Sequence, residues 1–186
     1  QMCIRDSIGT PLSVVAAIFH TMNHAVFKAS LFMAVGIVDH ETGTRDMRML
    51  RGLKRAMPHT AALAIVASAA MAGVPLMNGF LSKEMFFTET LHVGGNENWW
   101  MSVAAVLMGL FSVIYSLRFI SVFFGRLAHD LPEEPHEPPR WMRVPIECLV
   151  LLCIAVGVMP ERVVGDVLTV ACLLYTSDAA DEEDSV

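Results

Sequence analysis

Hydrophobic residues gather in four long stretches that are separated by polar segments. The stretches cover roughly residues 12–38, 60–91, 99–124 and 145–159, and the last has an apolar extension beyond it. A helix needs about 20 mostly apolar residues to cross the hydrocarbon core of a bilayer. The pattern therefore predicts an all-α fold, a polytopic transmembrane helix bundle with about four membrane segments.

The second stretch is too long for one simple span and contains residues that interrupt helices. Gly73 and Pro75 lie in the sequence GVP, and Gly79 follows in NG. Irregular backbone at membrane depth is tolerated where it lines protein or a water-filled cavity, and transporters place ion sites at such breaks. We therefore expect a broken helix whose segment 73–79 is not helical.

Composition agrees with a membrane location and gives no sign of a nucleic-acid partner. The 186 residues are 54% hydrophobic and 17% charged, with a formal net charge of −6. Five acidic residues lie in the last nine positions, so the rest of the chain carries only −1. Residues 1–7 and 172–186 resemble translated sequencing adaptor and are expected to be non-native. Residues 8–171 are then a fragment of a larger membrane domain.

Basic residues lie in alternate loops. The loop 39–61 carries five Lys or Arg, and the third loop adds three, against one in the other two connections. By the positive-inside rule, the loop 39–61 is predicted to be cytoplasmic. An alternative use of these charges is to bind anionic lipid. The Pro-rich sequence DLPEEPHEPPRWMRVP in the third loop is expected to be an irregular connection.

The first apolar stretch contains basic residues at helical spacing. His20, His24 and Lys28 are four residues apart, which places them on one helix face over roughly 12 Å of the axis. A lysine in a bilayer must face a hydrated or protein-lined interior, and desolvation disfavours its charged form. Histidine exchanges protons near neutral pH, so the three residues are candidates for a proton relay. Hydrogen-bonded packing between helices and a metal site are the alternatives, and no third ligand favours the metal.

A second charged pair follows the predicted helix break. Lys83 and Glu84 lie a few residues beyond it, in an otherwise apolar segment. A buried cation needs a counter-charge, so we expect Glu84 to pair with Lys83 and Lys83 to exchange protons. A fixed ion pair that never titrates is the alternative.

The motifs in this order resemble a known family. HTMNHAVFKASLFMAVGIVDHETGTRDMRMLRGL, MAGVPLMNGFLSKEMFF and YSLRFISVFFG followed by PPRWMRVPIECLVLLCIAVGVMPE are similar to the large A subunit of the multi-subunit Mrp-type Na+/H+ antiporter. The resemblance covers about residues 9–170. Its superfamily includes the antiporter-like subunits of NADH:quinone oxidoreductase. The resemblance implies that His20, His24 and Lys28 are relay members, that Lys83 is the terminal proton-exchanging lysine and that Glu84 is its neighbour.

These observations predict a membrane subunit of a monovalent cation/proton antiporter, a secondary transporter rather than an enzyme. The expected partners are other antiporter subunits, H+, Na+ and the lipid bilayer of a bacterial inner membrane. We expect no cofactor and no metal centre. The alternatives are a proton-pumping subunit of respiratory complex I and, from another class, a purely structural membrane scaffold.

Overall fold

The computed structural model describes residues 11–94, 99–127 and 131–170. The two terminal segments predicted to be non-native, 1–7 and 172–186, lie outside the described residues. The described chain is helical, as the hydrophobic pattern predicts. Its elements are α2 (Pro11–Thr42), η1 (Leu53–Arg55), α3 (Pro58–Ala72), α4 (Asn78–Gly94), α5 (Trp99–Ser121) and α6 (Arg140–Val158). Residues 160–170 form a further helical segment.

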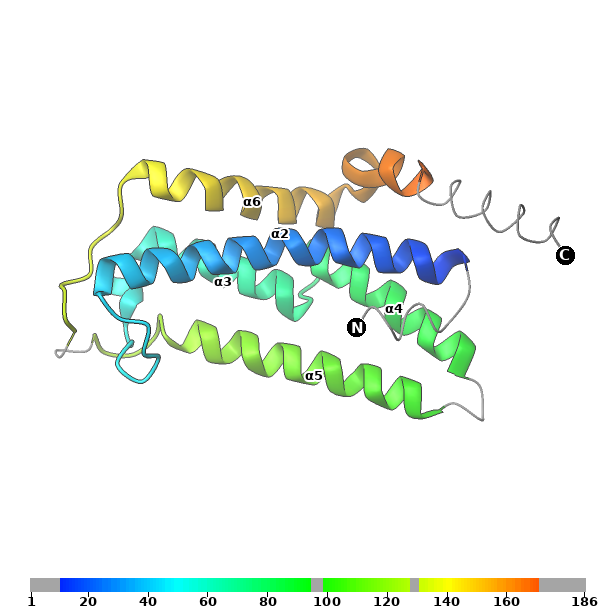
Figure 1. The fold of residues 1–186 in the computed structure, drawn as a ribbon, viewed down its shortest axis with the longest axis horizontal. Helices are drawn as coiled ribbons and strands as arrows, with labels where there is room; N and C mark the ends of the chain where they lie inside the picture. Colours follow the sequence, from blue (N-terminus) through cyan, green and yellow to red (C-terminus); the bar gives the residue numbers. More distant parts are fainter. Residues whose placement is uncertain (1–10, 95–98, 128–130, 171–186) are drawn as a thin grey trace, which may run out of the picture.

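The helices form an antiparallel bundle (Figure 1). α2 and α5 run in one direction, whereas α3 with α4 and then α6 run in the other. The connection 43–57 and the described parts of the next basic connection, 122–127 and 131–139, therefore lie at the same end of the bundle. α2 packs against α3, α4 and α6, while α5 packs mainly against α3 and α4.

Three helical regions are long and apolar enough to cross a membrane. These are Val15–Thr42, Trp99–Ser121 and Arg140–Val158, and Pro58–Ala72 is a shorter apolar helix. The second predicted segment is therefore present as two consecutive helices, α3 and α4. Large apolar side chains remain exposed along α5. Such a surface is expected to face lipid or other membrane helices rather than water.

The helix break occurs at residues 73–77, which is narrower than the predicted segment 73–79. α3 ends at Ala72, Gly73 follows in the left-handed conformation with φ 88°, and α4 begins at Asn78. The prediction is therefore wrong for residues 78 and 79, which are helical. Gly79 serves a different purpose, because a Cβ atom there would lie 1.8 Å from the Ala70 carbonyl oxygen. The absence of a side chain lets the first turn of α4 pack against the last turn of α3.

α6 lies directly against the break. A Cβ atom on Gly157 of α6 would come within 2.2 Å of the Leu76 carbonyl oxygen. Leu76 itself has a positive φ of 71°. The irregular link therefore contacts the α6 backbone on one side, while Val74, Pro75 and Leu76 stay exposed.

The Pro-rich connection is less irregular than expected. α6 begins at Arg140, with Pro139 as its N-cap, and Pro145 lies inside the helix. The sequence RWMRV, expected to be irregular, is therefore helical. A proline inside a helix removes one hydrogen bond to the carbonyl four residues earlier, and here that loss falls near the helix start.

Residue Glu137 in this connection caps another helix. Its carboxylate accepts hydrogen bonds from the Thr60 backbone N–H and hydroxyl, both at 2.9 Å, and from the His59 N–H at 3.3 Å. These groups belong to the first turn of α3, whose N-cap Met57 contributes no side-chain hydrogen bond. The connection therefore satisfies N–H groups that α3 leaves unpaired.

The basic loop is anchored to the rest of the bundle end. Leu53 and Met57 are fully buried. The Gly52 N–H bonds to the Phe124 carbonyl, and the Lys54 N–H bonds to the Phe123 carbonyl, both at 3.0 Å. The loop backbone is thus fixed, whereas most of its basic side chains stay exposed.

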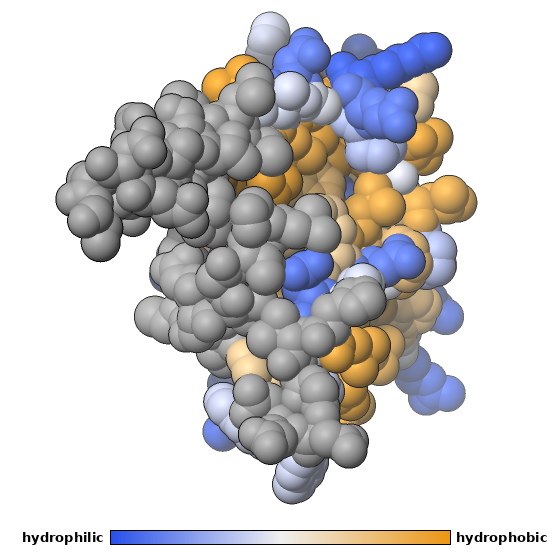
Figure 2. Space-filling view, turned by 90° about the vertical axis from the view of Figure 1, so that its right-hand side faces the viewer, coloured by the Kyte–Doolittle hydropathy of each residue, from blue (hydrophilic) through white to orange (hydrophobic). Residues whose placement is uncertain are grey.

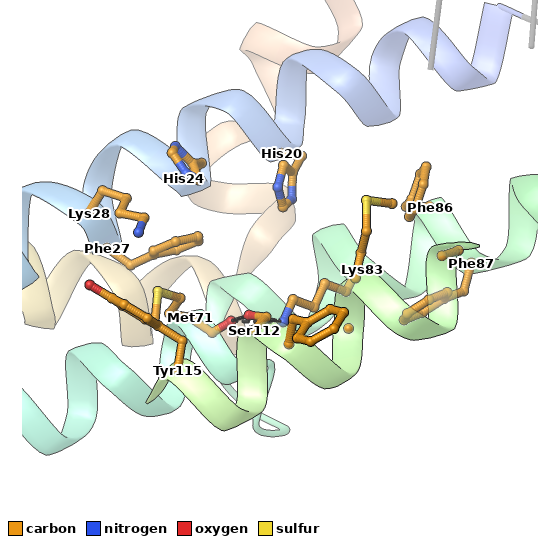
Figure 3. A pocket seen from close by; sticks show the side chains of 14 residues that line it. His20, His24, Phe27, Lys28, Met71, Lys83, Phe86, Phe87, Ser112 and Tyr115 are labelled. Carbon is orange, nitrogen blue, oxygen red and sulfur yellow. Dashed lines mark hydrogen bonds between the residues drawn. The ribbon is translucent and has the colours of Figure 1, made fainter. Parts of the chain in front are cut away.

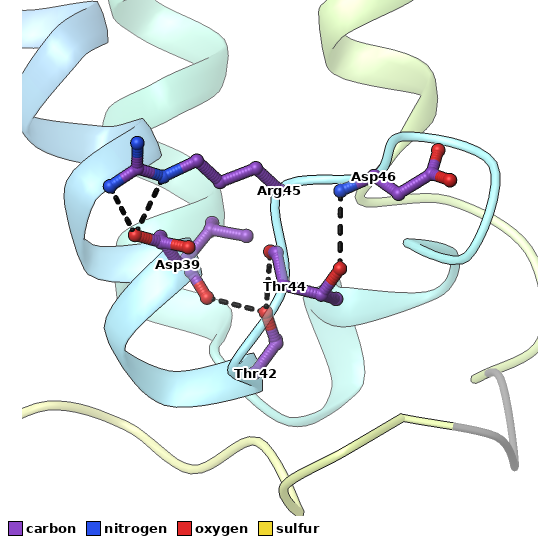
Figure 4. A network of polar contacts seen from close by, with 6 residues as sticks. Asp39, Thr42, Thr44, Arg45 and Asp46 are labelled. Carbon is purple, nitrogen blue, oxygen red and sulfur yellow. Dashed lines mark hydrogen bonds and ion pairs between the residues drawn. The ribbon is translucent and has the colours of Figure 1, made fainter.

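The start of this loop is held by local polar contacts (Figure 4). Arg45 Nη2 lies 2.7 Å from Asp39 Oδ2, and the Thr42 hydroxyl donates to the Val38 carbonyl at 2.6 Å. The hydrogen bond with Asp39, and next its charge, raise the pKa of Arg45. These contacts end α2 at Thr42 and turn the chain away from the helix axis.

Figure 2 shows the opposite end of the bundle, where α4 ends and α5 begins. Among the described residues visible there, hydrophobic and hydrophilic groups share the surface. Trp99 and Trp100, which open α5 at this end, are 66% and 55% exposed. Exposed indole rings at a helix end are typical of a membrane–water interface.

Candidate functional site

Four basic side chains that the sequence singles out line one cavity. His20, His24 and Lys28 reach it from α2, and Lys83 reaches it from α4. The cavity has a volume of about 380 Å³, and residues of α3 and α5 complete its wall. In Figure 3, His20 and Lys28 point from α2 into the space between that helix, α4 and α5. The helical spacing of the three α2 residues thus brings them together with a lysine that is distant in the sequence.

Lys83 is held by oxygen atoms at the helix break. Its Nζ atom donates to the Met71 carbonyl at 2.8 Å, to the Ala72 carbonyl at 2.9 Å and to the Ser112 hydroxyl at 3.0 Å. The last carbonyls of a helix have no intrahelical partner, and the C-terminal end of a helix attracts positive charge. The break therefore supplies the binding partners of the ammonium group.

Glu84 does not form the expected pair with Lys83. The ion pairs of the described residues do not include these two side chains, and Glu84 is exposed. Neighbouring residues on a helix point about 100° apart, so the two side chains leave α4 in different directions. The expectation that Glu84 supplies the counter-charge is wrong for this structure, because two carbonyls and a hydroxyl hold the ammonium group instead.

Glu84 lines a second cavity, which Lys83 also borders. This cavity has a volume of about 580 Å³ and lies between α4 and α5. Lys83, Phe87 and Gly109 line both cavities. Lys83 therefore borders both the cavity that the other basic residues line and the open cavity that Glu84 lines.

His20 contacts the residue that precedes Lys83. Its Nδ1 atom lies 3.0 Å from the Ser82 hydroxyl oxygen, and both side chains are buried. The Ser82 hydroxyl also lies 3.3 Å from the Gly79 carbonyl, to which it donates. Because the Ser82 hydroxyl donates its proton to that carbonyl, its oxygen is left to accept a hydrogen bond from His20 Nδ1–H in the tautomer that carries the proton on Nδ1. The contact connects α2 with α4 next to the lysine.

The other two α2 residues continue along the cavity. The ring centroids of His20 and His24 are 6.0 Å apart. Lys28 Nζ lies 5.3 Å from the centroid of the Tyr115 ring on α5, within the range of a cation–π interaction. The basic groups thus follow one another from Lys28 to His20.

Buried amides hold α2 against the start of α4. Asn78 Nδ2 donates to Asn23 Oδ1 at 3.2 Å, and the two residues are 0% and 2% exposed. Breaking this contact would leave two more buried amide atoms without a hydrogen bond, which costs free energy, so the contact favours a fixed position for the break beside α2.

Sequence reasoning missed three residues of the site. Ser82, Ser112 and Tyr115 lie in apolar stretches, where a hydroxyl residue by itself predicts nothing about function. The only available signals were the position of Ser82 immediately before Lys83 and the separation of Ser112 and Tyr115 by three residues, which places them on one face of α5.

A broken helix that presents a lysine to a cavity shared with three other basic side chains, within a bundle of membrane-length helices, defines a multi-pass membrane protein. The sequence model of the family described as "NADH:quinone oxidoreductase/Mrp antiporter, TM" matches residues 2–112. The chain belongs to this family.

Curated relatives carry antiporter names. The chain is 59% identical over 170 residues to the A/B subunit of a probable K+/H+ antiporter of Rhizobium meliloti, an alignment that covers 90% of this chain and 17% of that protein. It is 44% identical over 159 residues to the A subunit of the Na+/H+ antiporter of Bacillus subtilis, covering 81% of this chain and 20% of that protein. The chain thus spans about a fifth of the length of these relatives.

A solved structure has the same fold. The Mrp complex from Dietzia sp. contains a chain that matches with a TM-score of 0.75 and 37% sequence identity. The match covers 89% of this chain and 18% of that one. The helix arrangement described above is therefore that of one portion of a chain of the Mrp complex.

Proposed function

We propose that this chain is part of a membrane subunit of a monovalent cation/proton antiporter, in which protons pass along His20, His24, Lys28 and Lys83. The observation that carries the proposal is the shared cavity, which brings these basic side chains together at a helix break. The antiporter names of the relatives support it. The protein is then a secondary transporter.

Lys83 is the central group of this proposal. Its ammonium form is held by three oxygen atoms, and it borders both cavities. A lysine that is partly removed from water can lose its proton, and the neighbouring His20 contact offers a group that exchanges protons near neutral pH. A proton released by Lys83 thus has a receiver within the same cavity.

The redox-driven pump of complex I belongs to the same family and is the alternative transport function. The names of the relatives at 59% and 44% identity favour the antiporter. We also propose that the protein lies in a bacterial plasma membrane, beside other antiporter subunits, with the loop 39–61 in the cytoplasm. The common position of the two basic connections at one end of the bundle supports this orientation.

The test replaces Lys83 in the full-length protein within its complex. We expect Lys83→Ala to abolish cation-dependent proton movement in inverted membrane vesicles while the complex still assembles. Lys83→Arg is expected to be almost as damaging, because a guanidinium does not release its proton near neutral pH. Flux is normalised to the amount of assembled complex.

Lys54→Ala is the matched control, because Lys54 is an exposed lysine in the basic loop. We expect it to conduct protons at the rate of the unmodified complex. A purely structural role of the Lys83 charge predicts the opposite pattern, in which Arg is tolerated and Ala prevents assembly. Near-normal flux in Lys83→Arg would rule out proton exchange by this residue.

A further inference from the structure

The cavity that Glu84 lines is an open groove along the outside of α4 and α5. Each helix presents to it a row of residues spaced three or four apart, which places each row on one helix face. The exposed members of the two rows are Glu84, Thr88 and Leu91 on α4 and Val106, Leu110 and Val113 on α5. The groove is therefore mainly apolar and contains the exposed carboxylate of Glu84.

Glu84 lies at the level of the middle of a membrane-length helix. Gly109 and Leu110 line the same groove, and Leu110 is the central residue of the 23-residue helix α5. At 1.5 Å per residue, each end of α5 is roughly 16 Å from Leu110. The hydrocarbon core of a bilayer is about 30 Å thick, so this level lies near its centre. Lipid chains cannot solvate a carboxylate there, and an ionisable residue at this depth faces protein or water.

The described residues do not neutralise this carboxylate. Lys83 is the other charged residue of the groove, but its ammonium group is held by the two carbonyls and the hydroxyl described above. The Thr88 hydroxyl donates to the Glu84 backbone carbonyl at 2.9 Å, so its proton is not available to the carboxylate. The ion pairs of the described chain do not include Glu84. A positive group from outside these residues is the missing partner.

The polar groups of the groove do not continue along it. Lys83, Glu84 and Thr88 lie within two turns of α4, and the other lining residues are apolar or glycine. A passage filled with water needs polar groups along its length, because hydrophobic constrictions lose their water. An apolar groove with one polar level instead suits a membrane helix, which is apolar except where it bonds to a neighbouring helix.

We propose that a transmembrane helix carrying one Lys or Arg docks in this groove and pairs that residue with Glu84, and that this helix belongs to the part of the same subunit outside this chain. Charge complementarity specifies the basic residue, and the apolar rows on α4 and α5 receive the rest of the helix. The relatives named above are about five times as long as this chain, and a helix of the same polypeptide is held near the groove by its covalent link. This inference concerns assembly and does not depend on the proposed antiporter function.

Charge reversal in the full-length subunit within its complex tests the pair. Glu84→Lys places two positive groups together, so we expect the amount of assembled complex to fall by about tenfold or more. In this background, each Lys and Arg in the remaining membrane helices of the subunit is replaced by Glu in turn. One replacement should restore assembly, because it restores the pair with the signs exchanged. Glu134→Lys is the matched control, because it makes the same reversal at an exposed position of the connection 131–139 and should assemble normally.

Disulfide formation tests where the helix lies. Leu110 lines the groove, whereas Leu107 is one turn away, lines neither cavity and is similarly exposed, at 46% against 52%. In a subunit without its native cysteines, Leu110→Cys is combined with a cysteine close to the basic residue that the charge exchange identifies. Oxidation should join these two positions, because the docked helix brings their Cα atoms within about 7 Å. Leu107→Cys should not be joined.

Four results would overturn the inference. Normal assembly of Glu84→Lys would show that no positive group faces this carboxylate. Failure of every Glu replacement to restore assembly would exclude a single basic partner, and restoration by a replacement in another subunit would exclude a helix of the same polypeptide. Equal cross-linking through Leu107→Cys and Leu110→Cys would place the helix outside the groove. These readouts measure assembly and contact, so they leave the test of proton flux in Lys83→Arg separate.

Discussion

Polar contacts stabilise both the interior of the bundle and its loop end, but those in the interior join residues that are far apart in the sequence. Around Lys83, hydrogen bonds connect α4 to the end of α3 and to α5, and Asn23 with Asn78 connects α2 to α4. At the loop end, the Arg45 pair is local in sequence and largely exposed. The interior contacts fix helices relative to one another, whereas the exposed contacts shape only a turn.

The loop end also contains one contact between residues that are far apart in the sequence. Glu137 bonds to the first turn of α3, 77 residues away in the sequence. Burial and sequence separation, rather than formal charge, thus distinguish contacts that organise the fold. Exposed ion pairs contribute little because water competes with them, whereas a buried polar group that loses its partner is costly.

The largest expected effect comes from Gly79→Ala in the interior. The new methyl group would lie 1.8 Å from the Ala70 carbonyl oxygen, so α4 must move away from α3. Overpacking of this kind costs roughly 1–3 kcal/mol or more. We expect a strong decrease in assembled complex and in its thermal stability in detergent.

Gly36→Ala provides the control within α2. This glycine is exposed, and an added Cβ atom meets nothing within 4 Å. Alanine favours a helix over glycine by about 1 kcal/mol, so stability should stay the same or rise. Equal behaviour of the two variants would contradict the close packing at the break.

Glu137→Ala is expected to have an intermediate effect. It removes the carboxylate that accepts hydrogen bonds from the first turn of α3, and the loss of a helix cap costs about 1 kcal/mol. Thermal unfolding of the complex measures the change. Glu134→Ala, at an exposed position of the same connection, should have no effect. If both substitutions lower stability equally, the loss of negative charge is responsible rather than the cap.

Arg45→Ala is expected to have the smallest effect. Its ion pair with Asp39 lies at the surface, where such pairs contribute little and are screened by salt. The melting temperature and its salt dependence should match those of the unmodified complex. A destabilisation as large as that of Glu137→Ala would show that the turn after α2 contributes to the fold more than its exposure indicates.

Periodicity predicted a large part of the site. The spacing of His20, His24 and Lys28 places them on one face because helix geometry determines which residues are neighbours. Gly73 and Pro75 indicated a break because neither residue suits the middle of a helix. These inferences required only local backbone chemistry, and the all-α membrane fold that they support is confirmed.

The contacts of Lys83 could not be predicted in the same way. Its partners at the end of α3 are backbone carbonyls, which every residue possesses, so no residue type marks them. The Ser112 hydroxyl comes from a helix that the sequence does not place beside the break. The start of α6 at Arg140 was missed because Pro145 suggested a boundary, although a proline near a helix start costs only one hydrogen bond.

The contact between Gly157 and the Leu76 carbonyl has a mechanical consequence. Because α6 backbone lies against the link between α3 and α4, the link cannot straighten into a continuous helix unless α6 moves aside. We therefore expect the break to keep its conformation, because α6 packs against one side of it, rather than to act as a flexible hinge. A neighbouring protein chain that displaced α6 would be expected to move the link as well, and with it the carbonyls that hold Lys83.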